Sequence, residues 1–176
     1  MGVEAFGISM QLVNRGEFRG ILGFLSQYGN IRFQRTEADS YFETVVGEYS
    51  DGIHFIDLQI RHAVTSDQCD LAVRFSLCSY DTIDAIFIKL IGDVLAAWEA
   101  EAWLMTSAIK QKTNYLPGDA RWLLAALPDE IVEMRRYWQN LFGTRQGAVR
   151  ARDSFSFAGV VKHGYALGQR RNNTGR

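Results

Sequence analysis

The dipeptide Asp51-Gly52 lies between two stretches in which apolar and polar residues alternate, 41–50 and 53–62. Asp-Gly in this setting is a strong short signal for a β-hairpin, because glycine readily adopts the positive φ of a tight turn. A two-residue turn determines the facing pairs of the hairpin: Tyr49 with His54, Val45 with Leu58, and Tyr41 with His62. That register places apolar side chains on one side and polar side chains on the other, so we predict a half-buried antiparallel pair.

A third strand is predicted over residues 71–77, where apolar and polar or small residues alternate again. Pairing Leu58 with Val73 keeps the apolar side chains of both strands on one face. The same register brings two pairs of opposite charge together on the polar face: Asp57 with Arg74, and Arg61 with Asp70. Facing opposite charges stabilise a sheet. They therefore support a register that was chosen on hydrophobicity alone.

The remaining elements follow from the spacing of apolar residues and from helix-ending signals. We expect, in chain order, a strand over 6–12, a helix from Asn14 to Gly29, a strand over 31–35, the three strands above, and helices from Thr82 to about Lys112, over Ala120–Leu127 and from Pro128 to Gly143. The order β-α-β-β-β-β followed by helices predicts an α+β fold. Its sheet is a mainly antiparallel meander, packed by the C-terminal helices.

Charge divides the chain into an acidic body and a basic end. Residues 1–143 hold 12 Lys/Arg against 19 Asp/Glu, whereas residues 144–176 hold 7 against 1. We expect residues 1–150 to form a single α+β domain. The opposite charges favour a basic C-terminal segment, 151–176, that is partly packed back onto the body as a strand, with its last residues free.

No catalytic or metal-binding motif occurs in the sequence: nucleophile elbows, phosphate-binding loops, dinucleotide fingerprints, CxxC, HxxxH and EF-hand loops are all missing. His54 and His62 on one strand would lie about 26 Å apart, too far to share a metal. Each is expected to pack against its facing tyrosine. Cys69 and Cys78 would lie about 30 Å apart on one strand, so we expect free thiols. We therefore predict no cofactor, no metal and no catalytic residue.

Four tryptophans lie in the C-terminal half that is predicted to be helical: Trp98, Trp103, Trp122 and Trp138. Trp98 and Trp103 would lie about 140° apart around a helix, so one core-facing stripe does not hold both. Exposed aromatic residues concentrate at protein-binding surfaces. The four tryptophans are therefore the candidate residues for binding a protein partner.

Three arginines near the C-terminal end suit a different partner, a nucleic acid: Arg145, Arg150 and Arg152. Cations there would contact phosphates, while neighbouring aromatic rings would stack on bases. The opposite charge of the body favours packing of this segment onto the chain over binding to nucleic acid.

Without a catalytic motif, the acidic body and the tryptophans favour a non-enzymatic protein-binding module. A bacterial immunity protein or chaperone-type accessory protein that masks a partner is one example. One alternative is a small-ligand binder or enzyme with a pocket between sheet and helices. The other is nucleic-acid binding through the C-terminal segment. With no apolar stretch of about 20 residues and no signal sequence, we expect a cytoplasmic protein without membrane contact.

Overall fold

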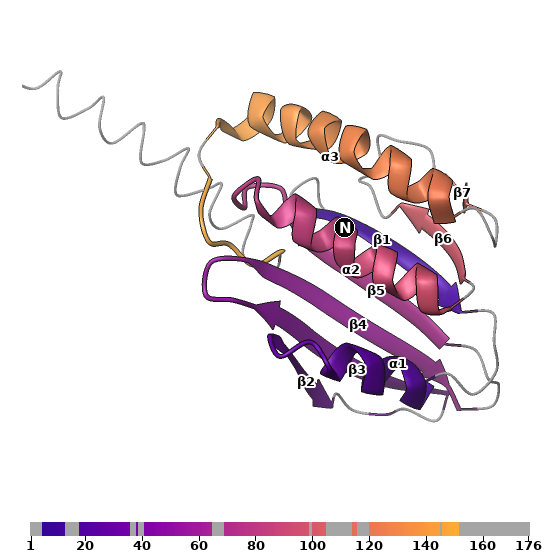
Figure 1. Cartoon of the computed structure of the whole chain (residues 1–176). Helices are drawn as coiled ribbons and strands as arrows, with labels where there is room; N and C mark the ends of the chain where they lie inside the picture. The colour runs from indigo at the N-terminus through magenta and orange to yellow at the C-terminus, as the bar shows by residue number, and fades with distance from the viewer. Residues whose placement is uncertain are drawn as a thin grey trace, which may run out of the picture.

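The computed structural model describes residues 5–12, 18–35, 38, 41–64, 69–98, 100–104, 114–115, 120–144 and 146–151. Within these residues, a seven-stranded sheet carries three helices on one of its faces (Figure 1). The strand order is β2-β3-β4-β5-β1-β6-β7, and each pair of neighbours is antiparallel. The predicted α+β class, with helices packed on an antiparallel sheet, is confirmed.

The strands are β1 (Ala5–Leu12), β2 (Ile31–Arg35), β3 (Phe42–Ser50), β4 (Phe55–Ala63), β5 (Cys69–Ser76), β6 (Ala100–Leu104) and β7 (Asn114–Tyr115). The helices are α1 (Phe18–Ser26), α2 (Ile83–Ala97) and α3 (Ala120–Phe142). Strands β2 to β5 form the predicted meander. The first strand of the chain, β1, lies between β5 and β6 and so becomes a central strand.

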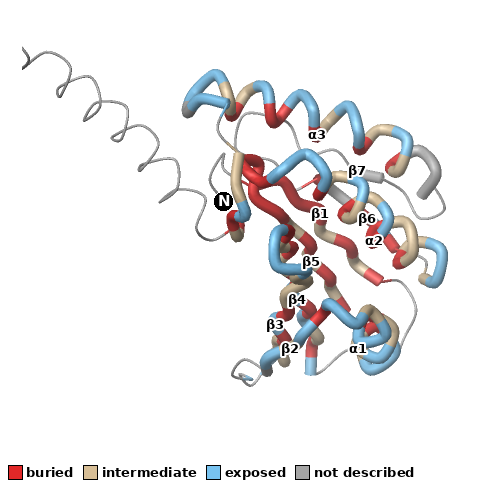
Figure 2. The backbone as a smooth tube through the Cα atoms, turned by 60° about the vertical axis from the view of Figure 1, so that its left-hand side comes forward, coloured by how far each residue is buried: buried red, intermediate tan, exposed pale blue. Residues whose placement is uncertain are grey.

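The core lies between the sheet and the helices (Figure 2). Alternate residues of the central strands point toward the helices, among them Phe6, Ile8, Ile56, Leu58, Val73 and Phe75, each no more than 1% exposed. The rings of Phe6, Phe75 and Phe87 contact one another, with centroids 4.9 to 5.8 Å apart. Burying one such side chain contributes about 1.5–3 kcal/mol. The alternation seen in the sequence therefore identifies the face of the sheet that is buried.

The hairpin at Asp51-Gly52 is present, but its predicted register is wrong by two residues. Ser50 pairs with Phe55, so the connection spans residues 51–54 instead of two residues. The Asp51 carboxylate accepts the backbone N–H groups of Ile53 and His54, at 3.1 and 2.8 Å. An aspartate that bonds its own turn in this way holds a longer connection closed. A shift of two keeps every side chain on its face, so the separation of apolar and polar sides is correct.

The tyrosine–histidine pairs expected across this hairpin are wrong, as a consequence of the shifted register. Tyr41 lies before β3 and is 67% exposed. His62 stacks instead on Phe18 of α1, with ring centroids 4.9 Å apart. His54 lies in the connection and is 6% exposed. Neither histidine therefore faces the tyrosine that was predicted from a two-residue turn.

The predicted register between β4 and β5 is confirmed. Leu58 faces Val73 within the core, and on the opposite face Asp57 faces Arg74 and Arg61 faces Asp70. The Arg74 guanidinium lies 3.3 Å from the Asp57 carboxylate. Hydrophobic alternation and charge pairing together were thus sufficient to align these two strands.

The long helix expected from Thr82 to about Lys112 is wrong beyond Ala97. Helix α2 ends there, and the chain becomes strand β6, which pairs with β1. Ala100, Ala102 and Leu104 of β6 are buried, whereas Glu101 is exposed. The alanines and glutamates of this stretch favour a helix locally. Pairing with β1 and burial of one face outweigh that preference.

The two helices expected over 120–127 and 128–143 are a single helix, α3, which continues through Pro128. Proline in a helix interior costs about 3 kcal/mol. A continuous apolar stripe is buried along α3 on both sides of the proline, comprising Leu123, Leu127, Ile131, Met134 and Trp138. Its burial outweighs the loss of one backbone hydrogen bond. Gly143, with φ of 96°, ends the helix as predicted.

After α3 the chain packs back onto the body as far as Ala151. The N–H of Gly147 donates to the Cys78 carbonyl at 2.9 Å, and the Ser79 hydroxyl donates to the Val149 carbonyl at 3.0 Å. Val149 and Ala151 are 7% and 5% exposed. A strand and a free end were expected within residues 151–176. Apart from Ala151, these residues lie outside the described ones.

Candidate functional site: the open face of the sheet

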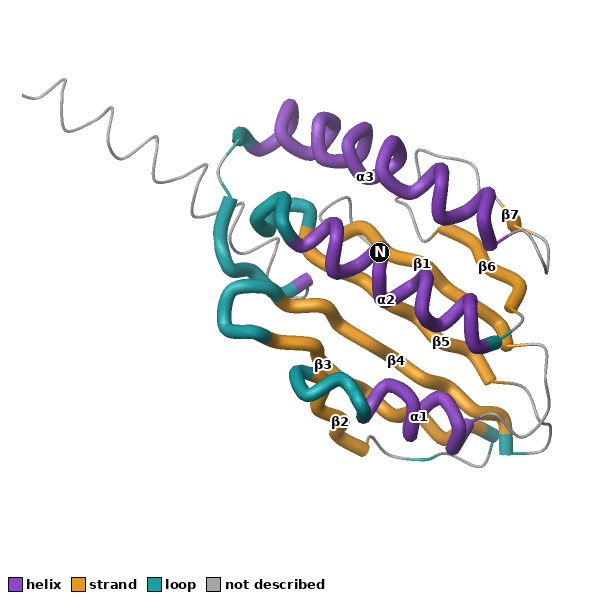
Figure 3. Tube along the Cα trace, in the orientation of Figure 1, coloured by secondary structure: helices purple, strands orange, loops and turns teal. Residues whose placement is uncertain are grey.

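The face of β2 to β5 that points away from the helices is polar, and none of the described helices lies on it (Figure 3). We call this surface the open face. It is formed by Arg32 and Gln34 of β2, Thr44, Val46 and Glu48 of β3, Asp57, Gln59 and Arg61 of β4, and Asp70, Ala72 and Arg74 of β5. These residues alternate with the buried ones, because successive side chains of a strand point to opposite faces.

The strand registers arrange the open face in three rows that cross the sheet. The rows are Arg32, Glu48, Asp57 and Arg74; then Gln34, Val46, Gln59 and Ala72; then Thr44, Arg61 and Asp70. The central row is uncharged, and the two flanking rows contain both signs of charge. The neutral row is therefore bordered on both sides by charged side chains.

The first charged row is extended by Arg150, which reaches it from the segment after α3. Its guanidinium makes two hydrogen bonds to the Glu48 carboxylate, at 2.6 and 3.1 Å. It also lies over the Phe55 ring, 4.2 Å from the centroid. A bidentate arginine–carboxylate contact holds both side chains in a defined geometry. This end of the open face is thus ordered before any partner binds.

The opposite end of the open face has a similar arrangement. The Arg61 guanidinium lies over the Phe42 ring, 3.6 Å from its centroid. Between the two ends, Arg74 and Asp57 form the 3.3 Å ion pair, with side chains 40% and 17% exposed. Arg61, Arg74 and Asp57 are consequently held by contacts with their neighbours.

A groove of about 800 Å³ lies over this face and is lined by residues of β2 to β5 and by Arg150. Val46, which is 38% exposed, offers an apolar contact in the neutral row. With Arg150 included, the open face carries four arginines (Arg32, Arg61, Arg74, Arg150) against three carboxylates (Glu48, Asp57, Asp70), a net charge of only +1. A phosphate backbone requires an excess of cations. Amides, two apolar residues (Val46 and Ala72) and charges of both signs instead suit the mixed polar surface of a protein.

Of the four tryptophans predicted to bind a partner, Trp138 is 1% exposed and lies in the core. Trp98 follows α2, is partly buried and packs edge-to-face on Phe24, with centroids 4.8 Å apart. The side chains of Trp103 and Trp122 lie outside the described part of the structure. The structure thus places one tryptophan inside the protein and one at the contact of α1 with α2.

Of the three arginines proposed for nucleic acid, Arg145 and Arg152 lie outside the described residues. Arg150 belongs to the open face, where Glu48 already binds its guanidinium. Sequence reasoning placed Glu48, Asp57 and other polar residues of the hairpin on one face, but did not identify that face as a site. The signal was their strict alternation with buried residues. The contribution of Arg150, 102 positions from Glu48, had no local signal.

A hydrogen-bonded chain of carboxylate, imidazole and hydroxyl joins Asp51, His54 and Thr82, with distances of 2.7 and 2.6 Å. Hydrolases use such chains when backbone donors beside the hydroxyl stabilise an oxyanion. The N–H groups of the two residues after Thr82 instead donate to carbonyls of the same turn, each at 3.0 Å. We therefore interpret the hydrogen bonds that join Asp51, His54 and Thr82 as a structural link between the 51–54 connection and the start of α2.

Among the described residues, no group of three or more His, Cys, Asp or Glu side chains is placed to hold a metal ion. None of the described helices combines the length and the apolar character that crossing a membrane requires. Cys69 and Cys78 are both buried, and the Cys78 sulfur lies 2.8 Å from the Ser76 hydroxyl.

No family model and no curated protein matches the sequence. Among solved structures, the chain resembles one from the toxic C-terminal tip of CdiA from Pseudomonas aeruginosa in complex with an immune protein. The identity is 16% and the TM-score 0.38, and the match covers 64% of this chain and 93% of the other.

Proposed function

We propose that this chain is a protein-binding module whose docking surface is the open face. The observation that carries the proposal is a sheet surface, free of any described helix, with a groove of about 800 Å³. Four of its charged groups are held in place by the Arg150–Glu48 and Arg74–Asp57 pairs. A surface that is ordered before binding loses less conformational entropy when a partner docks.

We further propose that the partner is a basic protein that this chain masks, as an immunity protein or chaperone-type accessory protein would. The body, residues 1–143, carries 12 Lys/Arg against 19 Asp/Glu. An acidic body attracts a basic partner over a longer range than any single contact. The open face, with four arginines and three carboxylates, then provides the specific contacts through side chains of both signs. A cytoplasmic location stays a prediction.

Site-specific cross-linking in cells that naturally carry the gene identifies the partner. A photoreactive amino acid at Gln59, which is exposed in the neutral row, should form a discrete adduct with one protein. The matched control is Val132, 51% exposed on α3 at the opposite side of the sheet. We expect no such adduct from position 132. Adducts of equal yield at both positions would contradict docking on the open face.

The identified protein is then purified, and its affinity is measured by calorimetry. Ala72→Arg places a long charged side chain in the neutral row. We expect it to weaken binding about tenfold or more, which is about 1.4 kcal/mol. Val132→Arg adds the same charge to α3 and should leave the affinity unchanged. Equal affinities of the wild type and Ala72→Arg, with both variants folded, would refute the proposed surface.

A further inference from the structure

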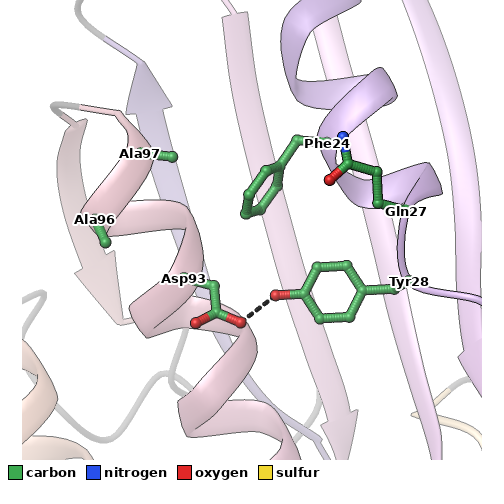
Figure 4. A pocket seen from close by; sticks show the side chains of 6 residues that line it. All are labelled: Phe24, Gln27, Tyr28, Asp93, Ala96 and Ala97. Carbon is green, nitrogen blue, oxygen red and sulfur yellow. Dashed lines mark hydrogen bonds between the residues drawn. The ribbon is translucent and has the colours of Figure 1, made fainter.

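A second pocket lies between α1 and α2, on the helix side of the sheet (Figure 4). Its volume is about 480 Å³, and it is open to solvent. Its lining consists of Phe24, Gln27, Tyr28, Asp93, Ala96 and Ala97. The Phe24 ring and the two alanines form an apolar part, and the Tyr28 hydroxyl and Asp93 carboxylate a polar part. The pocket thus combines an apolar wall with a negative charge, within the size range of small-ligand sites.

The polar part of the pocket is a defined hydrogen-bonded group. The Tyr28 hydroxyl donates to the Asp93 carboxylate, and the Lys89 ammonium lies 2.5 Å from the same carboxylate oxygen. The hydrogen bond from Lys89, supported by that from Tyr28, lowers the pKa of Asp93. Burial, with the nearby Asp93 carboxylate, raises the pKa of Tyr28, which remains a donor. A negative oxygen therefore faces the pocket at neutral pH.

The contacts of Lys89 indicate which chemical group can bind between the Asp93 carboxylate and the Tyr28 ring. Its ammonium lies 5.7 Å from the centroid of the Tyr28 ring while it contacts Asp93. An alkylammonium group thus already occupies both the aromatic face and the carboxylate. The Lys89 side chain is 70% exposed. An exposed pair four residues apart on a helix contributes little to stability, so Lys89 competes only weakly with an external cation for the Asp93 carboxylate.

We propose that the α1–α2 pocket binds a small primary alkylammonium ion. Its head would take the position of the Lys89 ammonium between Asp93 and Tyr28, and its alkyl chain would lie along Phe24, Ala96 and Ala97. This site goes beyond the proposed function and does not depend on it, because the open face lies on the other side of the sheet. Either assignment can fail while the other stands.

Titration of the full chain with hexylammonium chloride, followed by NMR, tests this site. The methyl signals of Ala96 and Ala97 and the side-chain amide of Gln27 should shift in a saturable manner. Hexan-1-ol has the same chain without the charge, and we expect it to bind about tenfold more weakly. Equal affinity for the alcohol and the ammonium ion would overturn the proposal, since the apolar wall alone would then account for binding.

Two variants should change the affinity for hexylammonium in opposite directions. Asp93→Asn removes the charge and should weaken binding about tenfold. Lys89→Met removes the internal competitor and should strengthen binding about twofold. Weaker binding by Lys89→Met, or unchanged binding by Asp93→Asn, would overturn the assignment. If Asp93→Asn does not fold, Lys89→Met and the comparison with hexanol decide the question.

Discussion

Asp51 closes the β3–β4 connection through two groups of contacts. One carboxylate oxygen accepts the backbone N–H groups of Ile53 and His54, and the other is 2.7 Å from the His54 ring. The other ring nitrogen of His54 forms a hydrogen bond with the Thr82 hydroxyl at the start of α2. A single exposed aspartate therefore connects the hairpin tip to a helix. The hydrogen bonds with His54 and Ile53 outweigh the effect of burial, which acts in the other direction, and lower the pKa of Asp51 to about 2.

The titration of Asp51 predicts a specific pH dependence of stability. Because its pKa in the folded state lies below the usual 3.8, ionised Asp51 stabilises the fold above about pH 4. That contribution is lost as the pH falls from about 4 toward about 2. Asp51→Asn keeps an oxygen acceptor but lacks the charge. Melting temperatures of both proteins between about pH 2 and 7 should differ most above pH 4 and converge near pH 2. A difference that is independent of pH would contradict this role.

At the scale of elements, Arg135 joins α3 to the end of β5 and the start of α2. Its side chain is 6% exposed, donates to the carbonyls of Leu77 and Ser79 at 2.8 and 2.7 Å, and pairs with the Asp84 carboxylate. Burial raises the pKa of Asp84, although Arg135 acts to lower it. The helix layer is thus attached to the sheet through one buried cation as well as through apolar contacts.

Replacing this arginine should destabilise the protein strongly. Arg135→Met leaves Asp84 and two carbonyls without their donor, and we expect a loss of about 3–5 kcal/mol. Arg136→Met is the matched control, because Arg136 is the next residue and is exposed. Urea unfolding measures the free energy of unfolding of both variants. The double variant Arg135→Met/Asp84→Asn should recover part of the stability that Arg135→Met loses. Equal stability of the Arg135 and Arg136 variants would show that the buried pair is unimportant.

At the scale of the whole molecule, we propose that the C-terminal segment packs onto the body from residue 152 to about Leu167, with its last residues free. The chain reaches Ala151 beside the open face, where Val149 is buried and Arg150 is bound to Glu48. Phe155 and Phe157 then alternate around Ser156, as in a half-buried strand. Burying two such side chains would contribute about 3–6 kcal/mol. The alternative is a segment that becomes ordered only when it binds a partner.

Deleting residues 152–176 distinguishes these alternatives. Packing predicts lower solubility and a melting temperature lower by about 6 °C or more. A shorter deletion, of residues 169–176, serves as the control and should leave the melt unchanged. An unchanged melt after the longer deletion, together with lost binding of the partner identified by cross-linking, would support the alternative.

The sequence by itself determined the strands β1 to β5 and, in β1, β3, β4 and β5, the face that is buried. Alternation in residues such as Ile56, Leu58 and Ile60 encodes burial locally, because a strand has a period of two. The β4–β5 register followed as well, since Asp57–Arg74 pairing and apolar alignment agree. The polar side of the hairpin, which became the open face, was visible in the same pattern.

Only the tertiary structure decided the rest. The β3–β4 register depends on how Asp51 bonds its own turn and His54, which dipeptide statistics do not include. Strand β6 exists because β1 offers it a pairing edge, against the helix preference of its alanines. Arg150 joins the open face from 102 residues away. A sequence pattern records which side of an element is buried, but contacts between distant segments arise only when the elements pack together.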